Sequence, residues 1–124
     1  MSISSSAPWL QFYGETPRTI DYPQATMYQM IRSAAKRFPD NAYEFMGRRT
    51  TYAEFLRRID LAAKALLELG IQKGDRVTIC MPNSPQGVDC FYACNRIGAV
   101  SNMIHPLSAP KEIKFYLNFS HSKA

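Results

Sequence analysis

The spacing of apolar residues along the chain predicts an irregular start followed by an alternation of helices and strands. Residues 1–23 contain three prolines among polar residues and no repeating apolar spacing, so we expect an irregular N-terminal arm there. From residue 24 the apolar positions recur at helical spacing or in short continuous runs. We therefore expect a partial α/β subdomain over residues 24–124.

Helix start and stop signals divide this second part. Thr26 with Gln29, and Thr51 with Glu54, have the spacing of capping boxes at helix N-termini. Ser84 is followed by Pro85, as is common where a helix begins. Helices are predicted over residues 27–38, 52–69, 85–97 and 111–119.

The remaining apolar runs predict strands. A hairpin is expected from a strand over residues 42–46, a tight turn at Gly47 and Arg48 and a return strand over residues 49–51. Two core strands are expected over residues 76–81 and 100–104. The order strand, helix, strand, helix implies parallel strands joined by crossovers, with helices covering the sheet. Because the chain stops where this alternation requires another strand, we expect an incomplete sheet.

Composition and charge narrow the function classes. The chain is 46% hydrophobic and 20% charged, which is typical of a globular protein. Its net charge of +5 raises the question of an anionic partner, but the basic residues are scattered and form no long run, so nucleic-acid binding is not favoured. No apolar stretch reaches the roughly 18 residues that a transmembrane helix needs, and no signal pattern is present. A cytoplasmic location is expected.

The three cysteines, Cys80, Cys90 and Cys94, lie in apolar segments, and we expect buried thiols in a reducing compartment. Cys90 and Cys94 would share a helix face. Because His105 and His121 do not have ligand-like spacing to them, we expect no metal site.

Residues with evident catalytic chemistry are not found. The glycines are isolated and form no phosphate-binding loop, and no nucleophile with a base and an orienting group is apparent. The position to weigh is His105, which follows a predicted strand and precedes Pro106. It could line a ligand cleft beyond the carboxyl end of the sheet, or it could be satisfied by the loop backbone. Asn83 and Ser84 follow the predicted strand over residues 76–81, and a role in capping the next helix is sufficient to explain these polar residues there.

Four motifs occur in a fixed order: T-Y-A-E-F from Thr51, L-G-I-Q-K-G-D-R-V from Leu69, M-P-N-S-P from Met81 and I-G-A-V from Ile97. In this succession the chain, over residues 26–124, resembles the N-terminal portion of the adenylate-forming, AMP-binding enzyme superfamily, and is most similar to acyl-CoA synthetases acting on fatty or aryl acids.

The resemblance implies the N-terminal part of the large domain of an enzyme that makes an acyl-adenylate from an acid and ATP and then an acyl-CoA. ATP, Mg²⁺ and CoA are expected for the complete enzyme. The family's ATP-binding and catalytic motifs have no match in this sequence, so we expect neither cofactors nor activity in this chain alone. By the same resemblance His105, Pro106 and Leu107 correspond to a loop on the CoA side of acetyl-CoA synthetases, although they lack its glycines.

Two partner hypotheses follow. In the first, the chain packs with the remainder of a synthetase. In the second, it is a stand-alone binding or assembly module that docks onto another chain, or onto itself, through an exposed sheet edge.

Overall fold

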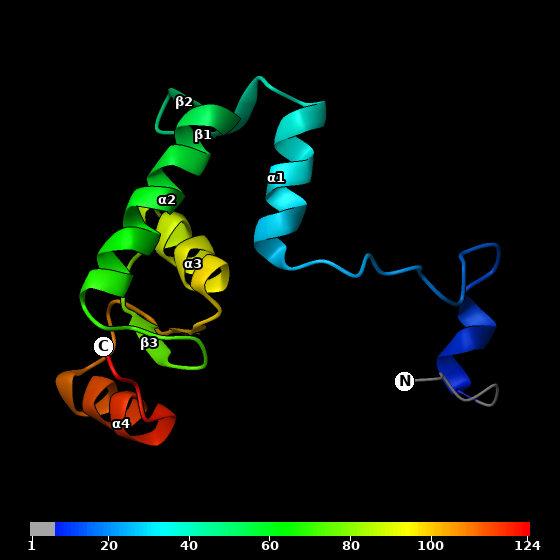
Figure 1. Ribbon diagram of the computed structural model, residues 1–124. Helices are drawn as coiled ribbons and strands as arrows, with labels where there is room; N and C mark the ends of the chain where they lie inside the picture. The colour runs from blue at the N-terminus through cyan, green and yellow to red at the C-terminus, as the bar shows by residue number, and fades with distance from the viewer. Residues whose placement is uncertain (1–6) are drawn as a thin grey trace.

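The computed structural model describes residues 7–124, so the first six residues of the predicted arm lie outside it. The elements in chain order are the 3₁₀ helix η1 (Pro8–Phe12), α1 (Met27–Arg37), β1 (Asn41–Phe45), β2 (Arg48–Thr51), α2 (Tyr52–Glu68), β3 (Arg76–Ile79), α3 (Pro85–Ile97), β4 (Val100–Met103) and α4 (Pro110–Ser120). Figure 1 shows α2 and α3 side by side, with β3 and α4 at one end and η1 far from the other elements.

The helix starts form as predicted, with one exception. The Thr26 hydroxyl accepts a hydrogen bond from the Gln29 backbone amide, and the Gln29 side-chain oxygen accepts one from the Thr26 backbone amide, so the first capping box is complete. Thr51 accepts from the Glu54 amide, but the Glu54 carboxylate turns away and accepts from Arg48 at 3.0 Å. The second capping box is therefore wrong in its second half, because a guanidinium is a stronger partner for a carboxylate than an amide is.

The strands form two small sheets. β1 and β2 pair antiparallel as the predicted hairpin, but the turn is formed by Met46 and Gly47, one residue earlier than predicted, because Arg48 already pairs with Phe45. β3 pairs parallel with β4 across the α3 crossover, from Arg76 opposite Val100 to Ile79 opposite Met103. The α/β class, the parallel pairing and the incomplete sheet are confirmed.

The last residues of the chain lie along the other edge of β3. The amides of Val100 and Ile104 donate to the carbonyls of Asp75 and Ile79, so the odd-numbered residues of β3 bond to β4. The even-numbered groups face the opposite way: the Arg76 carbonyl accepts from the Lys123 amide, and the Thr78 amide donates to the Ala124 carbonyl. β3 is thus hydrogen-bonded along both edges, to β4 on one side and to Lys123 and Ala124 on the other.

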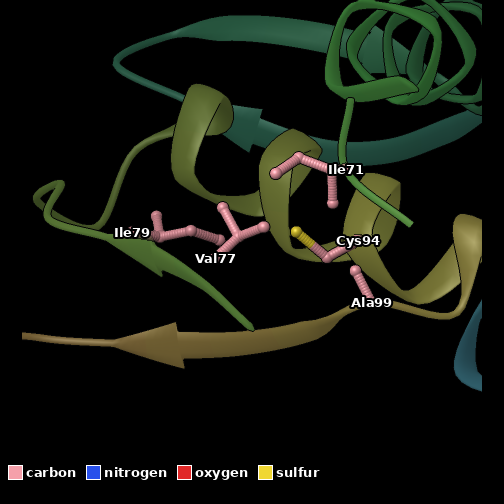
Figure 2. Packing of buried hydrophobic residues seen from close by; sticks show 5 residues of the cluster. All are labelled: Ile71, Val77, Ile79, Cys94 and Ala99. Carbon is pink, nitrogen blue, oxygen red and sulfur yellow. The ribbon is translucent and has the colours of Figure 1, made fainter. Parts of the chain in front are cut away.

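The core lies between this sheet and α3. It consists of Ile71, Val77, Ile79, Cys94 and Ala99, each at most 9% exposed, and Figure 2 shows α3 lying across the strands with these side chains between them. α2 packs on α3 through Phe55, Ile59 and Ala63, which are also buried. Burial of one large side chain such as Ile59 stabilises the fold by about 1.5–3 kcal/mol. Leu69, predicted on the same face, is 73% exposed because it lies at the C-cap, where the helical spacing ends.

The cysteines differ in exposure. Cys94 is fully buried and Cys90 half-buried, and burial raises the pKa of both thiols, which keeps them protonated. Cys80 is exposed, so its predicted burial is wrong: β3 ends at Ile79, and Cys80 already belongs to the loop that leads to α3.

A hydrogen-bonded network joins α4 to the sheet face opposite α3. The Asn102 amide nitrogen donates to the hydroxyls of Thr78 at 3.0 Å and Ser120 at 3.1 Å. The Ser122 hydroxyl lies 2.5 Å from that of Thr78 and 2.8 Å from that of Ser120. The Ser120 hydroxyl also donates to the Leu117 carbonyl. These four side chains hold the end of α4 beside β3.

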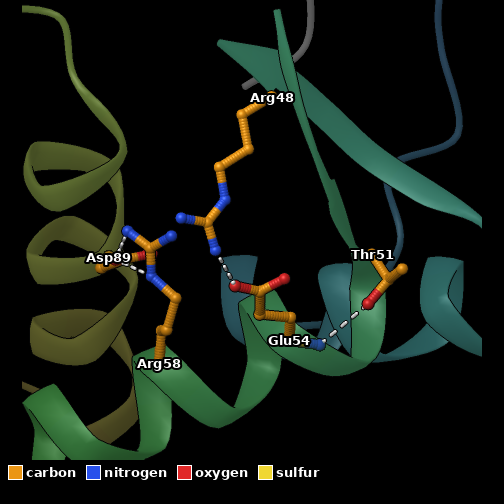
Figure 3. Close-up of polar contacts among 5 residues, drawn as sticks. All are labelled: Arg48, Thr51, Glu54, Arg58 and Asp89. Carbon is orange, nitrogen blue, oxygen red and sulfur yellow. Dashed lines mark hydrogen bonds and ion pairs between the residues drawn. The ribbon is translucent and has the colours of Figure 1, made fainter.

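An ion pair connects α2 and α3. Arg58 donates from Nε at 2.8 Å and from a terminal nitrogen at 2.5 Å to one oxygen of Asp89, whose side chain is 9% exposed (Figure 3). The second carboxylate oxygen of Asp89 is buried and has no hydrogen-bond partner. Burial raises the pKa of Asp89, and the hydrogen bonds and charge of Arg58 oppose that rise.

We expect Arg58→Met to destabilise the chain by about 3 kcal/mol at pH 7, because it leaves a buried carboxylate unpaired. The folded-state pKa of Asp89 lies above its unfolded value, so its contribution to stability is fully present below the unfolded pKa and is lost as the pH rises through the folded pKa. Without Arg58 the pKa of Asp89 rises further, so more of the carboxyl is protonated and uncharged at pH 5. The destabilisation caused by Arg58→Met should therefore be smaller at pH 5 than at pH 7. Urea unfolding at both pH values measures this, and an equal loss at both would contradict it. Arg58→Met with Asp89→Leu, which removes both charges, is the control and should recover most of the stability.

The hairpin turn contains a strained residue. Met46 has a φ of +49° and Gly47 a φ of +78°, as a type I′ turn requires. For a residue with a side chain this region costs about 1–2 kcal/mol, and Met46 is 91% exposed, so its side chain gains little packing in return.

Replacing Met46 with Asn, which tolerates positive φ, should stabilise the chain by about 0.5–1 kcal/mol in thermal or urea unfolding. Gly47→Ala is the matched control. A Cβ there would meet no atom within 4 Å, so its expected loss of about 1 kcal/mol is due to the backbone alone. A destabilising Met46→Asn would show that the methionine side chain makes a contact that outweighs the strain.

Candidate functional site

A groove of about 720 Å³ lies at the carboxyl ends of β3 and β4. Its lining comes from the two loops that follow these strands: Met81, Pro82, Asn83, Met103, Ile104, His105, Pro106 and Leu107. Because β3 and β4 are parallel, their carboxyl ends meet at one edge of the sheet, where α/β proteins bind ligands. The predicted site residues His105, Pro106 and Leu107 are thereby brought together with Asn83 from the other loop.

His105 is exposed and is held by its own loop. Its Nδ1 accepts a hydrogen bond from the Leu107 amide at 3.2 Å, and its carbonyl accepts from the Ser108 amide at 3.2 Å. With Nδ1 accepting, the neutral imidazole carries its proton on Nε2, which remains available as a donor. The loop backbone thus satisfies one ring nitrogen of His105, and the ring also lines the groove.

The neighbouring residues give the groove its character. Leu107 is 86% exposed, and Met103 and Met81 are 52% and 38% exposed. Ser84 is occupied as the N-cap of α3 and accepts from the Gly87 amide, so the capping explanation is confirmed for it. The groove is apolar with two polar side chains, Asn83 and His105, and is suited to binding an extended apolar group, not to acid–base or phosphate chemistry.

The lining residues Met81 and Met103 were not singled out from the sequence. Strand ends followed by proline or histidine are visible there, but an apolar residue at a strand end is indistinguishable from a core residue until the layers are known. No group of three or more histidine, cysteine or acidic side chains between residues 7 and 124 is arranged to hold a metal ion. No helix in the same range is long and apolar enough to cross a membrane.

Two of the sequence motifs form the turns that precede β3 and β4. Gly98, in I-G-A-V, ends α3 with a φ of +77°, and a Cβ there would come within 2.9 Å of the Lys73 side chain. Asp75, in K-G-D-R-V, accepts from the Gln72 amide and from Lys123 Nζ at 2.6 Å. The hydrogen bond from Lys123 and that from the Gln72 amide lower the pKa of Asp75. These residues fix the turns that lead into β3 and β4, at the ends of the strands opposite the groove.

Comparison with known proteins is consistent with this arrangement. The model of the AMP-binding enzyme family matches residues 31–124, about three quarters of the chain. A long-chain-fatty-acid–CoA ligase of Bacillus subtilis is 32% identical over 93% of this chain and 21% of its own length. An acetyl-coenzyme A synthetase of Deinococcus radiodurans is 52% identical over 44% of this chain and 8% of its own length.

Solved structures agree. The N-terminal domain of FACL13 from Mycobacterium tuberculosis superposes with a TM-score of 0.75 at 34% identity, over 80% of this chain and 26% of that one. The N-terminal subdomain of NpsA from Klebsiella oxytoca, in complex with anthranilyl-AMSN, also gives 0.75, at 27% identity over 79% of this chain and 26% of that one. The chain spans 21% of the length of the Bacillus subtilis ligase and 8% of the length of the Deinococcus radiodurans synthetase.

Proposed function

The chain belongs to the AMP-binding enzyme family, and we propose that it supplies the N-terminal part of the large domain of an AMP-forming acid–CoA ligase, with the groove beside His105, Pro106 and Leu107 facing the acyl or CoA substrate. The observation that carries this proposal is the position of the groove, at the shared carboxyl edge of the parallel pair.

The lining of the groove supports an apolar acid as the substrate. Methionine, isoleucine and leucine side chains provide adaptable apolar contact, and the Nε2–H of His105 offers one donor to a carbonyl or amide that passes it. The match to a fatty-acid ligase, at 32% identity over 93% of this chain, supports a fatty acid, and the match to an acetyl-coenzyme A synthetase, at 52% identity over 44% of the chain, supports acetate as the alternative.

The groove does not suit ATP or Mg²⁺. Among its lining residues there is no carboxylate to bind a magnesium ion and no lysine or arginine to meet phosphates. We therefore assign ATP and Mg²⁺ binding to the part of the relatives' length that this chain does not span, and expect this chain to contribute packing and one wall of the substrate path.

Pyrophosphate release with ATP, Mg²⁺, CoA and a panel of fatty and aromatic acids tests this assignment. We expect background rates from the chain alone, and turnover when it replaces the corresponding residues of the Bacillus subtilis ligase. Turnover by the chain alone would overturn the proposal.

In that chimera His105→Ala should raise KM for the acid or for CoA about three- to tenfold with a smaller change in kcat, as expected for loss of one binding hydrogen bond. His121→Asn is the matched control, since His121 lies outside the groove and Asn tolerates its positive φ. Equal constants for the two variants would remove His105 from the substrate path.

A second function, as an assembly module, is favoured by the open edge of β4. Because the amides of Val100 and Ile104 bond to β3, those of Ser101 and Met103 point away from the sheet. Val100 and Met103 are each 52% exposed, and β4 contains no charge or proline that would block pairing with another strand.

If this edge mediates self-association, light scattering should show dimers or larger species whose population rises with concentration. Met103→Pro, which removes an outward amide, should give monomers without loss of helical circular dichroism. Asn102→Pro is the contrasting variant, because it removes an inward amide and should unfold the β3–β4 pair. A wild-type monomer at millimolar concentration would exclude self-association through this edge.

A further inference from the structure

Helix α1 has an exposed apolar strip. Although its apolar residues recur at helical spacing, none of its side chains is buried. Met27 and Met30 are each 44% exposed, and Phe38, which follows the helix, is 61% exposed. An amphipathic helix in a globular protein normally buries this face, so the exposed strip requires an explanation.

The inner side of α1 is attached firmly to the rest of the chain. The Tyr28 amide donates to the Asn95 side chain at 2.8 Å, and its hydroxyl donates to Asp60 at 2.9 Å. Arg96 lies over the Tyr28 ring, 5.3 Å from its centre, and pairs with Asp60. α1 therefore cannot roll to bury its methionines, and they line a groove of about 420 Å³ together with Ile31, Ala34 and Tyr92.

The same helix carries an unbalanced positive charge. Met27–Arg37 contains Arg32, Lys36 and Arg37 and no acidic residue. Within residues 7–124 none of these three cations forms an ion pair, and Arg32 and Arg37 lie beside the aromatic rings of Tyr28 and Phe38 instead. Arg37 borders the groove itself. A partner that covers this surface should combine apolar groups with negative charge.

The arm adds exposed aromatic and aliphatic side chains. Trp9 and Phe12 of η1 are 54% and 80% exposed, and Ile20 and Tyr22, on the segment that leads to α1, are 67% and 76% exposed. Figure 1 shows that this arm extends from the N-terminal end of α1 away from the helices and sheet. Tryptophan and tyrosine rings are favoured at the boundary between lipid headgroups and acyl chains.

We propose that α1 and the arm form a binding surface for an anionic lipid bilayer. The methionines of α1 and the aromatic residues of the arm enter the headgroup region, while Arg32, Lys36 and Arg37 meet the lipid phosphates. The chain lies on the bilayer and does not cross it, since an eleven-residue helix is only about half the hydrocarbon thickness.

α4 is the rival surface, and it fits an anionic bilayer less well. It also exposes two rings, Phe115 at 58% and Phe119 at 76%, beside Lys111 and Lys114. Glu112 reduces its charge, and its C-terminal end is bound into the network of Thr78 and Asn102. The lysines of α4 therefore serve as the matched control.

Co-sedimentation with vesicles tests the proposal on the unmodified chain. Binding is expected with phosphatidylcholine vesicles that contain 30% phosphatidylglycerol, and it should weaken at least tenfold in pure phosphatidylcholine or at 0.5 M salt. Trp9 is the single tryptophan, so its fluorescence reports on the arm directly and should shift to shorter wavelength on binding. Absence of binding to the anionic vesicles, or binding with unchanged Trp9 emission, would overturn the proposed surface.

Variants locate the surface. Lys36→Gln with Arg37→Gln should weaken binding roughly thirtyfold, since each cation near an anionic bilayer contributes about 1 kcal/mol. Lys111→Gln with Lys114→Gln, the same change on α4, should have little effect, and the reverse result would place the surface on α4. The inference is independent of the substrate groove: vesicle binding does not require turnover, so either proposal can fail alone.

Discussion

The parallel pairing of β3 with β4 is the constraint on which the rest of the structure depends. Two parallel strands cannot be joined by a tight turn, so the chain must cross over, and α3 provides that crossover. Its return path places α3 on one face of the sheet and closes the core around Cys94. It also brings the two carboxyl ends together, and the groove lined by His105 lies there. Two residues of α3 then position the other helices: Asp89 pairs with Arg58 of α2, and Asn95 accepts a hydrogen bond from the Tyr28 amide of α1.

Local signals predicted most of the fold, and contacts between distant residues account for the failures. Ser84 and Thr26 cap helices because caps depend on residues three positions away. Glu54 was misjudged because its partner, Arg48, comes from the hairpin and is brought close only by folding. The Arg58–Asp89 pair was not visible for the same reason: both residues look like surface charges until α2 packs on α3.

The candidate site was half predictable. His105 could be singled out because the order of elements placed it at a strand end, and in the structure it lines the groove with Pro106 and Leu107. The hydrogen bond from the Leu107 amide to Nδ1 of His105 depends on the conformation of the loop. The sequence does not predict that conformation, because the loop lacks the glycines of the loop it resembles. In the sequence, the positive charge of α1 is one part of a scattered set of basic residues. That Arg37 borders an apolar groove appears only in the structure.

The network beneath α4 has a further property. The Asn102 amide nitrogen donates to both Thr78 and Ser120, and Ser120 donates to the Leu117 carbonyl. Since each hydroxyl has one proton, Ser122 must donate to Ser120, and Thr78 must donate to Ser122. A single orientation of all hydroxyl protons therefore satisfies the network. The hydrogen bonds therefore all run in one direction, and each bond polarises the next. Reversing any one hydroxyl would place two protons, or none, between neighbouring oxygens.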